Sequence, residues 1–213
     1  MRRTRVKICG LTREEDVVAA VEAGADACGF IFAPSPRRVS VERAAELTAL
    51  VPPPVARVGV FVDAERSFVD EAVRACGLTS VQFSGTESPE ECAGYGVSVV
   101  KVIAVGTDFD FSAAEPYRGL TAALLLDTYD PQRAGGTSQT FAWQLIGELP
   151  GWAPFFVAGG LTADNVASAI RTLKPFAIDA SSGVESAPGI KDHDKIRAFC
   201  AAVREADQGE EDT

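Results

Sequence analysis

The pattern of apolar positions divides the chain into short runs that alternate with longer amphipathic segments. The runs are rich in β-branched residues, and the segments between them are rich in alanine and carry apolar residues at helical spacing. Continuous apolar runs are typical of strands that are buried on both faces of a parallel sheet. The pattern therefore predicts eight strands, at residues 5–10, 27–32, 57–62, 80–83, 97–105, 122–127, 154–158 and 176–179.

A helix is expected after each of these strands. The first is predicted to begin at Thr12, because Glu15 follows three residues later and completes a capping-box pattern. Thr162 is predicted to cap the seventh helix, and Ser88 with Pro89 is predicted to open a short fourth helix. The remaining helices are expected from about residue 40, at 64–76, at 107–117 with a weak pattern, at 141–149 and at 192–205.

Alternating strand and helix units indicate an α/β protein, with either an open doubly wound sheet or a closed barrel. Eight similar units within 213 residues favour a single (β/α)8 barrel, the TIM barrel, near the short end of its size range. No linker or low-complexity run separates the units. We therefore expect one barrel domain at residues 1–205, followed by an acidic, disordered tail at residues 206–213.

The charge and the cysteines narrow the function. The chain has 20 basic and 30 acidic residues, for a formal net charge of −10. This balance argues against a nucleic-acid partner, whose phosphates require a clustered positive surface. The five cysteines form no C-x-x-C pair, and no apolar stretch is long enough for a signal peptide or a membrane span. We expect a cytoplasmic protein with reduced thiols and no membrane partner.

The chain has one histidine, His193, at the expected start of the last helix. A Ser-His-Asp triad needs a placed histidine, and an exposed polar residue is the more ordinary role at such a helix entry. Sites in which several histidines bind a metal are excluded. The sequence therefore predicts no metal site.

In a barrel of this kind the active site lies at the carboxyl ends of the strands. Cys9 ends the first strand two residues after Lys7, and a nearby cation favours a thiolate. Asp127 ends an apolar run, where desolvation can keep a carboxyl group protonated near neutral pH. We therefore favour Cys9 as a base and Asp127 as an acid over a small buried residue and a loop hydrogen-bond acceptor. Other polar residues expected at strand ends are Gln82, Ser84 and Asp179.

Glycines and serines follow the last two predicted strands. Gly159 and Gly160 precede a helix start, and Ser181, Ser182 and Gly183 follow the eighth strand. Such loops present backbone N–H groups to anions, and the loops after strands seven and eight are the usual phosphate site of this fold. The two segments together predict a phosphate site.

Two further loops can contact the rest of a substrate. Arg37 follows the second strand and can bind a carboxylate through two parallel hydrogen bonds. Residues 135–138, with the sequence Gly-Gly-Thr-Ser, follow the sixth strand. They are typical of a mobile lid, although an ordinary surface loop has the same composition.

Longer motifs containing these residues are spread over nearly the whole chain. They are Lys7-Ile8-Cys9-Gly10-Leu11-Thr12, Gly24-Ala25-Asp26-Ala27, Gly29-Phe30-Ile31-Phe32, Ser35-Pro36-Arg37, Arg57-Val58-Gly59-Val60-Phe61-Val62, Leu125-Leu126-Asp127-Thr128, Ala158-Gly159-Gly160-Leu161, Asp179-Ala180-Ser181-Ser182-Gly183-Val184-Glu185 and Pro188-Gly189-Ile190-Lys191-Asp192. Together they closely resemble the phosphoribosylanthranilate isomerase family of tryptophan biosynthesis.

The resemblance implies an Amadori rearrangement of N-(5-phosphoribosyl)anthranilate to 1-(2-carboxyphenylamino)-1-deoxyribulose 5-phosphate, without a metal or an organic cofactor. It implies that Asp127 protonates the ribose ring oxygen and that Cys9 removes the C2 proton of the resulting Schiff base. Arg37 would hold the anthranilate carboxylate. Asp179 would line the site. From their places at strand ends, Lys7 and Gln82 are expected to bind the substrate as well. The partner would be this small molecule, bound by a monomer or a homodimer.

Three positions depart from the family pattern: Ser84 replaces a histidine, Ser138 a glycine and Ala142 an aspartate. A paralogous phosphosugar-binding barrel with a shifted substrate or without activity therefore stays open. Two related barrel enzymes fit less well. An aminoimidazole-ribotide isomerase uses paired aspartates at strands one and five, and an indole-glycerol-phosphate synthase uses lysines and a glutamate at strand ends. Here the first strand ends in Cys9, and the only lysines within the predicted strands are Lys7 and Lys101.

Overall fold

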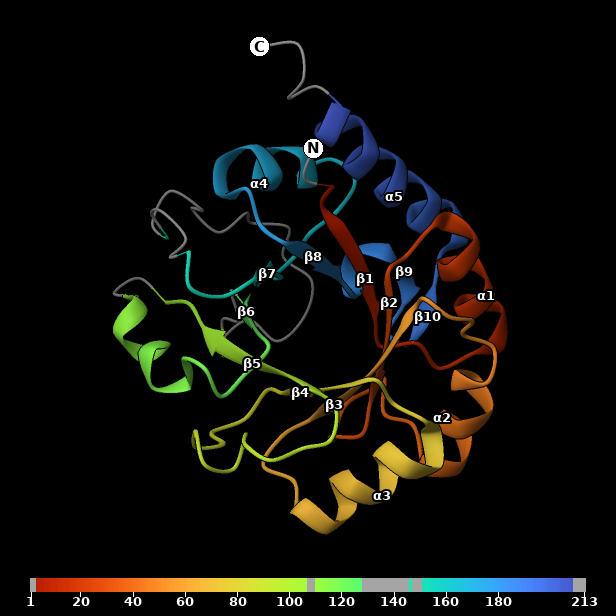
Figure 1. Ribbon diagram of the computed structural model, residues 1–213. Coiled ribbons are helices and arrows are strands. Elements are labelled where there is room, and N and C mark those ends of the chain that lie inside the picture. Colours follow the sequence, from red (N-terminus) through yellow and green to blue (C-terminus); the bar gives the residue numbers. More distant parts are fainter. Residues whose placement is uncertain (1–2, 107–109, 128–145, 147–150, 209–213) are drawn as a thin grey trace.

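The computed structural model describes residues 3–106, 110–127, 146 and 151–208. Eight parallel strands form a closed barrel in chain order, with helices around its outside (Figure 1). The predicted single (β/α)8 barrel is confirmed. The strands are β1 Arg5–Cys9, β2 Ala27–Ile31, β3 Ala56–Phe61, β4 Ser80–Phe83, β5 Ser98–Ala104, β6 Ala123–Asp127, β7 Phe155–Val157 and β8 Ala177–Ala180.

The barrel closes where β1 pairs with β8. In this register Lys7 lies opposite Asp179, and on the other side of β1 Cys9 lies opposite Gly29 of β2. Because all of the strands are parallel, their carboxyl ends open on the same face of the barrel. The closure therefore brings the ends of β8, β1 and β2 together in one part of the barrel mouth.

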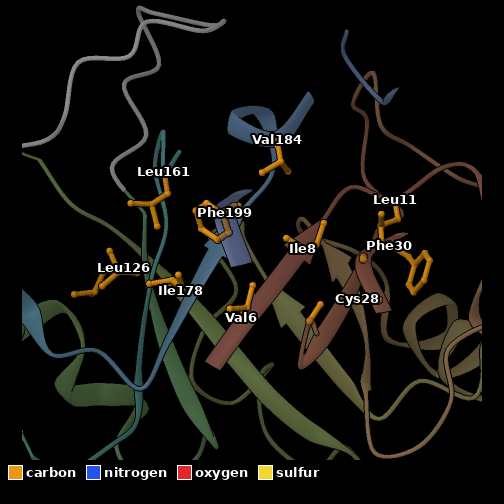
Figure 2. Packing of buried hydrophobic residues seen from close by; sticks show 14 of the residues in the cluster. Val6, Ile8, Leu11, Cys28, Phe30, Leu126, Leu161, Ile178, Val184 and Phe199 are labelled. Atoms are coloured by element: carbon orange, nitrogen blue, oxygen red, sulfur yellow. The ribbon is translucent and has the colours of Figure 1, made fainter. Parts of the chain in front are cut away.

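Side chains alternate between the barrel interior and the layer beneath the helices. The interior holds a small separate cluster that includes Val100 and Leu125. The larger outer cluster includes Ile8, which lies near Phe199 of the last helix in Figure 2. Cys9 follows Ile8 and therefore faces the interior, as does Lys7 on its other side. Asp127 lies two residues beyond Leu125 and faces the interior as well.

Five α-helices lie in the described part of the chain. They are α1 Glu14–Ala23, α2 Val41–Thr48, α3 Arg66–Cys76, α4 Val166–Leu173 and α5 His193–Gln208. Helix α2 begins as predicted, because the Ser40 hydroxyl accepts a hydrogen bond of 3.2 Å from the Arg43 N–H. Helix α3 begins at Arg66, two residues after the predicted start.

The predicted caps at Thr12 and Thr162 are wrong. The Thr12 hydroxyl donates to the Gly189 carbonyl oxygen at 2.6 Å, and α1 begins two residues later without a side-chain cap. Helix α4 begins four residues after Thr162, whose backbone N–H instead donates to the Asn165 side chain at 2.9 Å. Both threonines follow barrel strands and make loop contacts instead, Thr12 with Gly189 and Thr162 with Asn165 of its own loop.

The prediction of a helix after β4 is also wrong. Ser88 and Glu91 do form reciprocal side-chain-to-backbone hydrogen bonds of 2.7 and 3.3 Å, but turns follow them instead of a helix. Gly94, with a φ of +74°, ends the segment after a few residues. After β5 the weak helical pattern gives two 3-10 helices, η1 Phe111–Ala113 and η2 Glu115–Tyr117. The helix predicted at 141–149 lies outside the described residues, apart from the buried Ile146.

The last helix extends beyond its predicted end at residue 205. Helix α5 continues to Gln208, with Ala206 buried against the core. The carboxylate of Asp207 accepts hydrogen bonds of 2.8 and 2.7 Å from the backbone and hydroxyl of Thr4. These contacts place residues 206–208 in the barrel domain, where we had expected a tail. Residues 209–213 lie outside the described residues.

A short hairpin that the sequence pattern did not predict follows β8. After the 3-10 helix η4 Ser182–Val184, β9 Glu185–Ala187 pairs antiparallel with β10 Ile190–Lys191. The turn holds Gly189 at a φ of +80°, and a Cβ there would lie 3.2 Å from the Pro36 carbonyl oxygen. The hairpin therefore packs closely on the loops after β1 and β2. Strands of three and two residues are too short to show an alternating pattern in the sequence.

Candidate active site

A buried ion pair between Lys7 and Asp179 lies at the bottom of the site. The Lys7 ammonium lies 2.7 Å from Oδ2 of Asp179, and the two side chains are 1% and 8% exposed. Burial opposes the charge of Lys7, but Asp179 and Cys9 together hold the pKa of Lys7 above its usual value. Burial raises the pKa of Asp179, and Lys7 offsets only part of that effect. Consistent with this direction, Oδ1 of Asp179 is buried without a hydrogen-bond partner among the described residues.

Cys9 is buried at the end of β1, above this ion pair in the chain direction. Burial raises the pKa of its thiol, while the charges of Lys7 and Lys191 lower it without cancelling the effect of burial. The cation near Cys9 that the sequence predicted is therefore present, but desolvation is the larger influence. Gly29 is the neighbour on β2, and a Cβ there would lie 2.8 Å from the Cys9 sulfur. The absence of a side chain at Gly29 leaves room for the thiol.

Asp127 ends β6 and is half-buried in the barrel mouth. Its backbone carbonyl accepts a hydrogen bond of 2.9 Å from the N–H of Val105, which fixes the end of the strand. Strands β1 and β6 are separated by β7 and β8 on the shorter way round the barrel. Cys9 and Asp127 therefore approach the mouth from different sides, as an acid and a base on two faces of a ribose require.

Arg37 lies beside the mouth in a network of charged groups. Its Nε and Nη2 donate to the two carboxylate oxygens of Glu185 at 2.8 and 2.7 Å. The fully buried Lys191 ammonium donates to the same carboxylate at 2.8 Å. Burial works against a charged carboxylate, but these two cations hold the pKa of Glu185 below its usual value. The Arg37 side chain remains 21% exposed, so part of it can meet a ligand.

The two loops predicted to bind phosphate lie side by side. Gly159 and Gly160 both have positive φ angles, of +96° and +62°, which only glycine adopts without strain. A Cβ at Gly183 would collide with the Leu161 carbonyl oxygen, so the loops after β7 and β8 touch through backbone atoms. Ser181 and Ser182 are half-buried and exposed, respectively. The loops therefore offer backbone groups and hydroxyls at one part of the mouth.

Gln82 and Ser84 end β4 on the inner face of the barrel. The Gln82 amide donates to the Ser84 hydroxyl at 3.2 Å. Oε1 of Gln82 is buried without a hydrogen-bond partner among the described residues. The serine at the unusual position is thus a partner of Gln82, and the unpaired oxygen is available to a donor on a bound molecule.

A cleft of about 520 Å³ lies outside the barrel mouth, between the loops after β3 and β4. Its acidic side chains outnumber its single arginine, so the lining repels anionic groups such as a phosphate or a carboxylate. The charged residues lining the cleft are Asp63, Glu65, Arg66, Glu87, Glu90 and Glu91.

Within the described ranges no three His, Cys, Asp or Glu side chains lie close enough to hold a metal ion. His193, which we expected to be exposed, is only partly so, because its ring contacts the buried Asp16 carboxylate at 2.9 Å. The other cysteines are buried and free: Cys28, Cys76, Cys92 and Cys200. No helix in the described segments is long and apolar enough to cross a membrane.

Several residues that shape the site could not be given a role from the sequence pattern. Glu185 and Lys191 lie within recognised motifs, but their contact with Arg37 depends on the hairpin that the pattern did not predict. Gly29 lies in a motif as well, and only the register of β1 with β2 shows that it faces Cys9. Asn165 closes the loop after β7, because its amide donates to the Gly160 carbonyl oxygen at 3.0 Å.

Comparison with known proteins decides the family. The sequence profile of the N-(5'phosphoribosyl)anthranilate (PRA) isomerase family matches residues 6–202. The chain belongs to the phosphoribosylanthranilate isomerase family. It is 48% identical to the N-(5'-phosphoribosyl)anthranilate isomerase of Pseudomonas putida, over 97% of this chain and 100% of the relative. The enzyme of the same name from Myxococcus xanthus is 48% identical over 94% and 96% of the two chains.

Solved phosphoribosylanthranilate isomerases have the same fold. The Thermotoga maritima enzyme superposes with a TM-score of 0.85 at 39% identity, and the match covers 95% of this chain and 99% of that one. A further structure of the family, in complex with reduced 1-(o-carboxyphenylamino)-1-deoxyribulose 5-phosphate, gives a TM-score of 0.80 at 37% identity over the same shares. These findings confirm the expected activity, a phosphoribosylanthranilate isomerase of tryptophan biosynthesis.

Parts of the isomerase site predicted from the sequence lie outside the described residues. These are the glycine-rich segment 135–138, expected to be a lid, and the departures from the family pattern at Ser138 and Ala142. Another solved family member is described as a dimeric enzyme from Thermotoga maritima in the form of monomers. For the present isomerase, the choice between monomer and homodimer stays a prediction.

Proposed function

We propose that this isomerase rearranges N-(5-phosphoribosyl)anthranilate with Asp127 as the general acid and Cys9 as the general base. The observation that carries the proposal is that each of the two residues is the last of its strand, faces the barrel interior and lies at the same mouth. Arg37 and the paired loops after β7 and β8 flank the same mouth. A substrate with a carboxylate, a ribose and a phosphate has three groups that match these three parts of the site.

The reaction needs one proton delivered and one removed. The Asp127 carboxyl donates its proton to the ribose ring oxygen while the bond between that oxygen and C1 breaks, which gives an open-chain Schiff base with a protonated nitrogen. The Cys9 thiolate then takes the C2 proton, and the electron pair of that C–H bond moves toward the nitrogen to give an enolamine. Loss of the enol proton and protonation of C1 complete the ketone. Atoms balance without a metal or cofactor, which we do not expect in this site.

The remaining residues bind and orient the substrate in this proposal. Arg37 holds the anthranilate carboxylate, and the phosphate lies against the loops of Gly159, Gly160, Ser181, Ser182 and Gly183. The unpaired oxygens of Asp179 and Gln82 accept hydrogen bonds from ribose hydroxyls. Lys7 is buried against Asp179. Its position near a strand end predicted a contact with the substrate; in this proposal Lys7 acts instead through Asp179 and Cys9.

The proposal is tested by following anthranilate fluorescence after the substrate is made in situ. Wild type should consume the substrate rapidly, and Cys9→Ser and Asp127→Asn should each lower kcat on the order of 10² to 10⁴-fold, the usual contribution of a general acid or base. Cys76→Ser is the matched control, because that buried thiol lies at the end of α3 in the layer outside the barrel, where it donates to the Val41 carbonyl oxygen at 3.4 Å. It should keep the wild-type rate.

Two outcomes would contradict the proposal in different ways. A wild-type rate in either variant would remove that residue from its role. Tight binding of the reduced product by wild type without any turnover would favour the alternative of a paralogous barrel that lacks activity or acts on another substrate. The acidic charge, the free thiols and the small phosphorylated substrate support a cytoplasmic enzyme, as a monomer or homodimer, without nucleic-acid or membrane partners.

A further inference from the structure

The carboxylate of Glu185 connects two cations next to the barrel mouth. It accepts hydrogen bonds from Nε and Nη2 of Arg37 at 2.8 and 2.7 Å, and from the Lys191 ammonium at 2.8 Å. Glu185 is buried, and Lys191 has no exposed side-chain surface. The two parallel bonds to Arg37 form a bidentate pair, the arrangement that fixes the orientation of a guanidinium most strongly.

We infer that Glu185 is a positioning residue that fixes which edge of Arg37 meets the substrate, and thereby sets the preference for an aromatic amine with a carboxylate. The inference rests on the proposed function, in which Arg37 binds that carboxylate. It concerns how the arginine is held and what this does to substrate preference.

The donors of the guanidinium show why one edge is selected. An arginine has five N–H groups in a fixed plane. Glu185 takes the one on Nε and one on Nη2. The donors left are the second one on Nη2 and the two on Nη1, so the remaining fork is the outer edge between the two terminal nitrogens. A substrate carboxylate can form a second bidentate pair only with that edge.

The stem of Arg37 is fixed as well. Gly10 has a φ of +74°, and a Cβ there would lie 2.6 Å from Cδ of Arg37 and 3.2 Å from the Ser181 hydroxyl. The arginine stem therefore lies directly on the backbone after β1, next to Cys9. With both stem and head held, Arg37 does not need to be ordered when a ligand binds, and the loss of side-chain entropy on binding is smaller.

Lys191 connects this arrangement to the phosphate loop. Its ammonium donates to the Ser181 carbonyl oxygen at 3.0 Å in addition to Glu185. A single buried side chain thus fixes Glu185 relative to the loop expected to hold the phosphate. The spacing between the arginine edge and the phosphate loop is therefore set before the substrate arrives, and it matches only ligands that carry an acid group at each end.

Two stable amines provide the test. Reductive amination of ribose 5-phosphate with anthranilate or with aniline gives a pair of amino alcohols that differ by one carboxylate. Their Kd values would be measured by calorimetry for wild type, Glu185→Gln, Arg37→Met and the double variant. The ratio of the two Kd values reports the carboxylate preference, which a residue with a merely structural role would not change.

Glu185→Gln keeps the shape of the side chain but cannot accept two bonds from the guanidinium. We expect it to reduce the carboxylate preference on the order of tenfold, the effect of losing a charge-assisted hydrogen bond. Its Kd for the amine without the carboxylate should stay within about twofold of wild type. In the Arg37→Met background, Glu185→Gln should have no further effect on the ratio, because both substitutions act through the same group.

Equal weakening of both amines by Glu185→Gln would overturn the inference and leave Glu185 a structural role only. An unchanged preference would overturn it as well. If wild type bound neither amine, the proposed function itself would fail. If Glu185→Gln does not fold, as judged by circular dichroism, the same ratio of Kd values would be measured for Glu185→Asp. This variant keeps a negative charge beside Lys191. Glu71→Gln, at an exposed position on α3, is the control for removing one negative charge.

Discussion

The ammonium nitrogen of Lys7 lies 2.7 Å from Oδ2 of Asp179, across the strand pair that closes the barrel. Both side chains are buried, so neither charge is stabilised by water. Their attraction in the protein interior offsets a large desolvation penalty only while both partners are present. The pair therefore holds the residues at the bottom of the site in place, and loss of either partner should destabilise the fold.

Removal of one partner should be worse than removal of both. Lys7→Met leaves a buried carboxylate unpaired, and we expect it to lower the free energy of unfolding by about 3–5 kcal/mol. The double variant Lys7→Met/Asp179→Leu should lie closer to wild type than Lys7→Met alone, because no buried charge remains. Urea denaturation of the single and double variants measures the difference. Additive losses in the double variant would show that the two residues do not stabilise each other.

The reactivity of Cys9 should depend on pH. Burial raises the pKa of its thiol, and the nearby lysines compensate only in part. Because the thiolate is the form that is alkylated, the rate of reaction with iodoacetamide should still increase with pH beyond the ordinary cysteine value of about 8.5. The profile of kcat/KM should instead be bell-shaped, because the reaction needs Cys9 without its proton and Asp127 with one. An alkylation rate that is already constant from neutral pH upward would contradict a raised thiol pKa.

Gly29 should be needed for the position of the Cys9 thiol. Gly29→Ala places a Cβ 2.8 Å from the sulfur and 3.1 Å from Cα of Cys9. The thiol can rotate away but then leaves its place in the mouth, and we expect kcat to fall on the order of 10²-fold, as for a displacement of about 1 Å in a reacting group. Gly96→Ala, where the added Cβ meets nothing within 4 Å, is the control. Equal kcat values for the two variants would show that the thiol has other room.

The barrel could be predicted from the sequence because its strands are buried on both sides. Each of the eight predicted runs contains or overlaps one observed strand, since a continuous apolar run has few other stable places in a protein of this size. The helix starts were less predictable. Thr12 has the residue type of a cap, but its hydroxyl has a competing acceptor in Gly189, which is 177 positions away in the chain. Tertiary contacts of this kind leave no local signal.

In the site, too, local sequence signals could be interpreted and tertiary contacts could not. Cys9 and Asp127 could be placed at the mouth because their positions follow from the strands that they end. The contact between Arg37 and Glu185 joins residues 148 positions apart and depends on a hairpin with very short strands. Gln82 and Ser84 are separated by two positions, but their hydrogen bond depends on side-chain geometry. Pairings that depend on loop structure and side-chain geometry therefore could not be predicted from the sequence.

Asp16 is a further buried charge, at the outer side of the mouth. Its carboxylate accepts hydrogen bonds of 2.9 and 2.6 Å from the Arg13 guanidinium and of 3.1 Å from the backbone N–H of Lys191. The His193 ring contacts it at 2.9 Å. The carboxylate thus connects α1, β10 and the start of α5. Burial alone would raise its pKa, but these donors lower the pKa of Asp16 below its usual value.

Because the pKa of Asp16 is lowered, its contribution to the free energy of unfolding should depend on pH. A carboxylate with a lower pKa in the folded than in the unfolded chain stabilises the fold above the unfolded value of about 3.9, and the stabilisation is lost as the pH falls through the folded pKa. At pH 7 Asp16→Asn should therefore lower the free energy of unfolding by about 1–3 kcal/mol, from the loss of charged hydrogen bonds. The difference from wild type should shrink below pH 4. Denaturation at several pH values measures it, with the exposed Asp164→Asn as control. A difference that stayed constant down to pH 2 would show that the charge of Asp16 is not the source of its contribution.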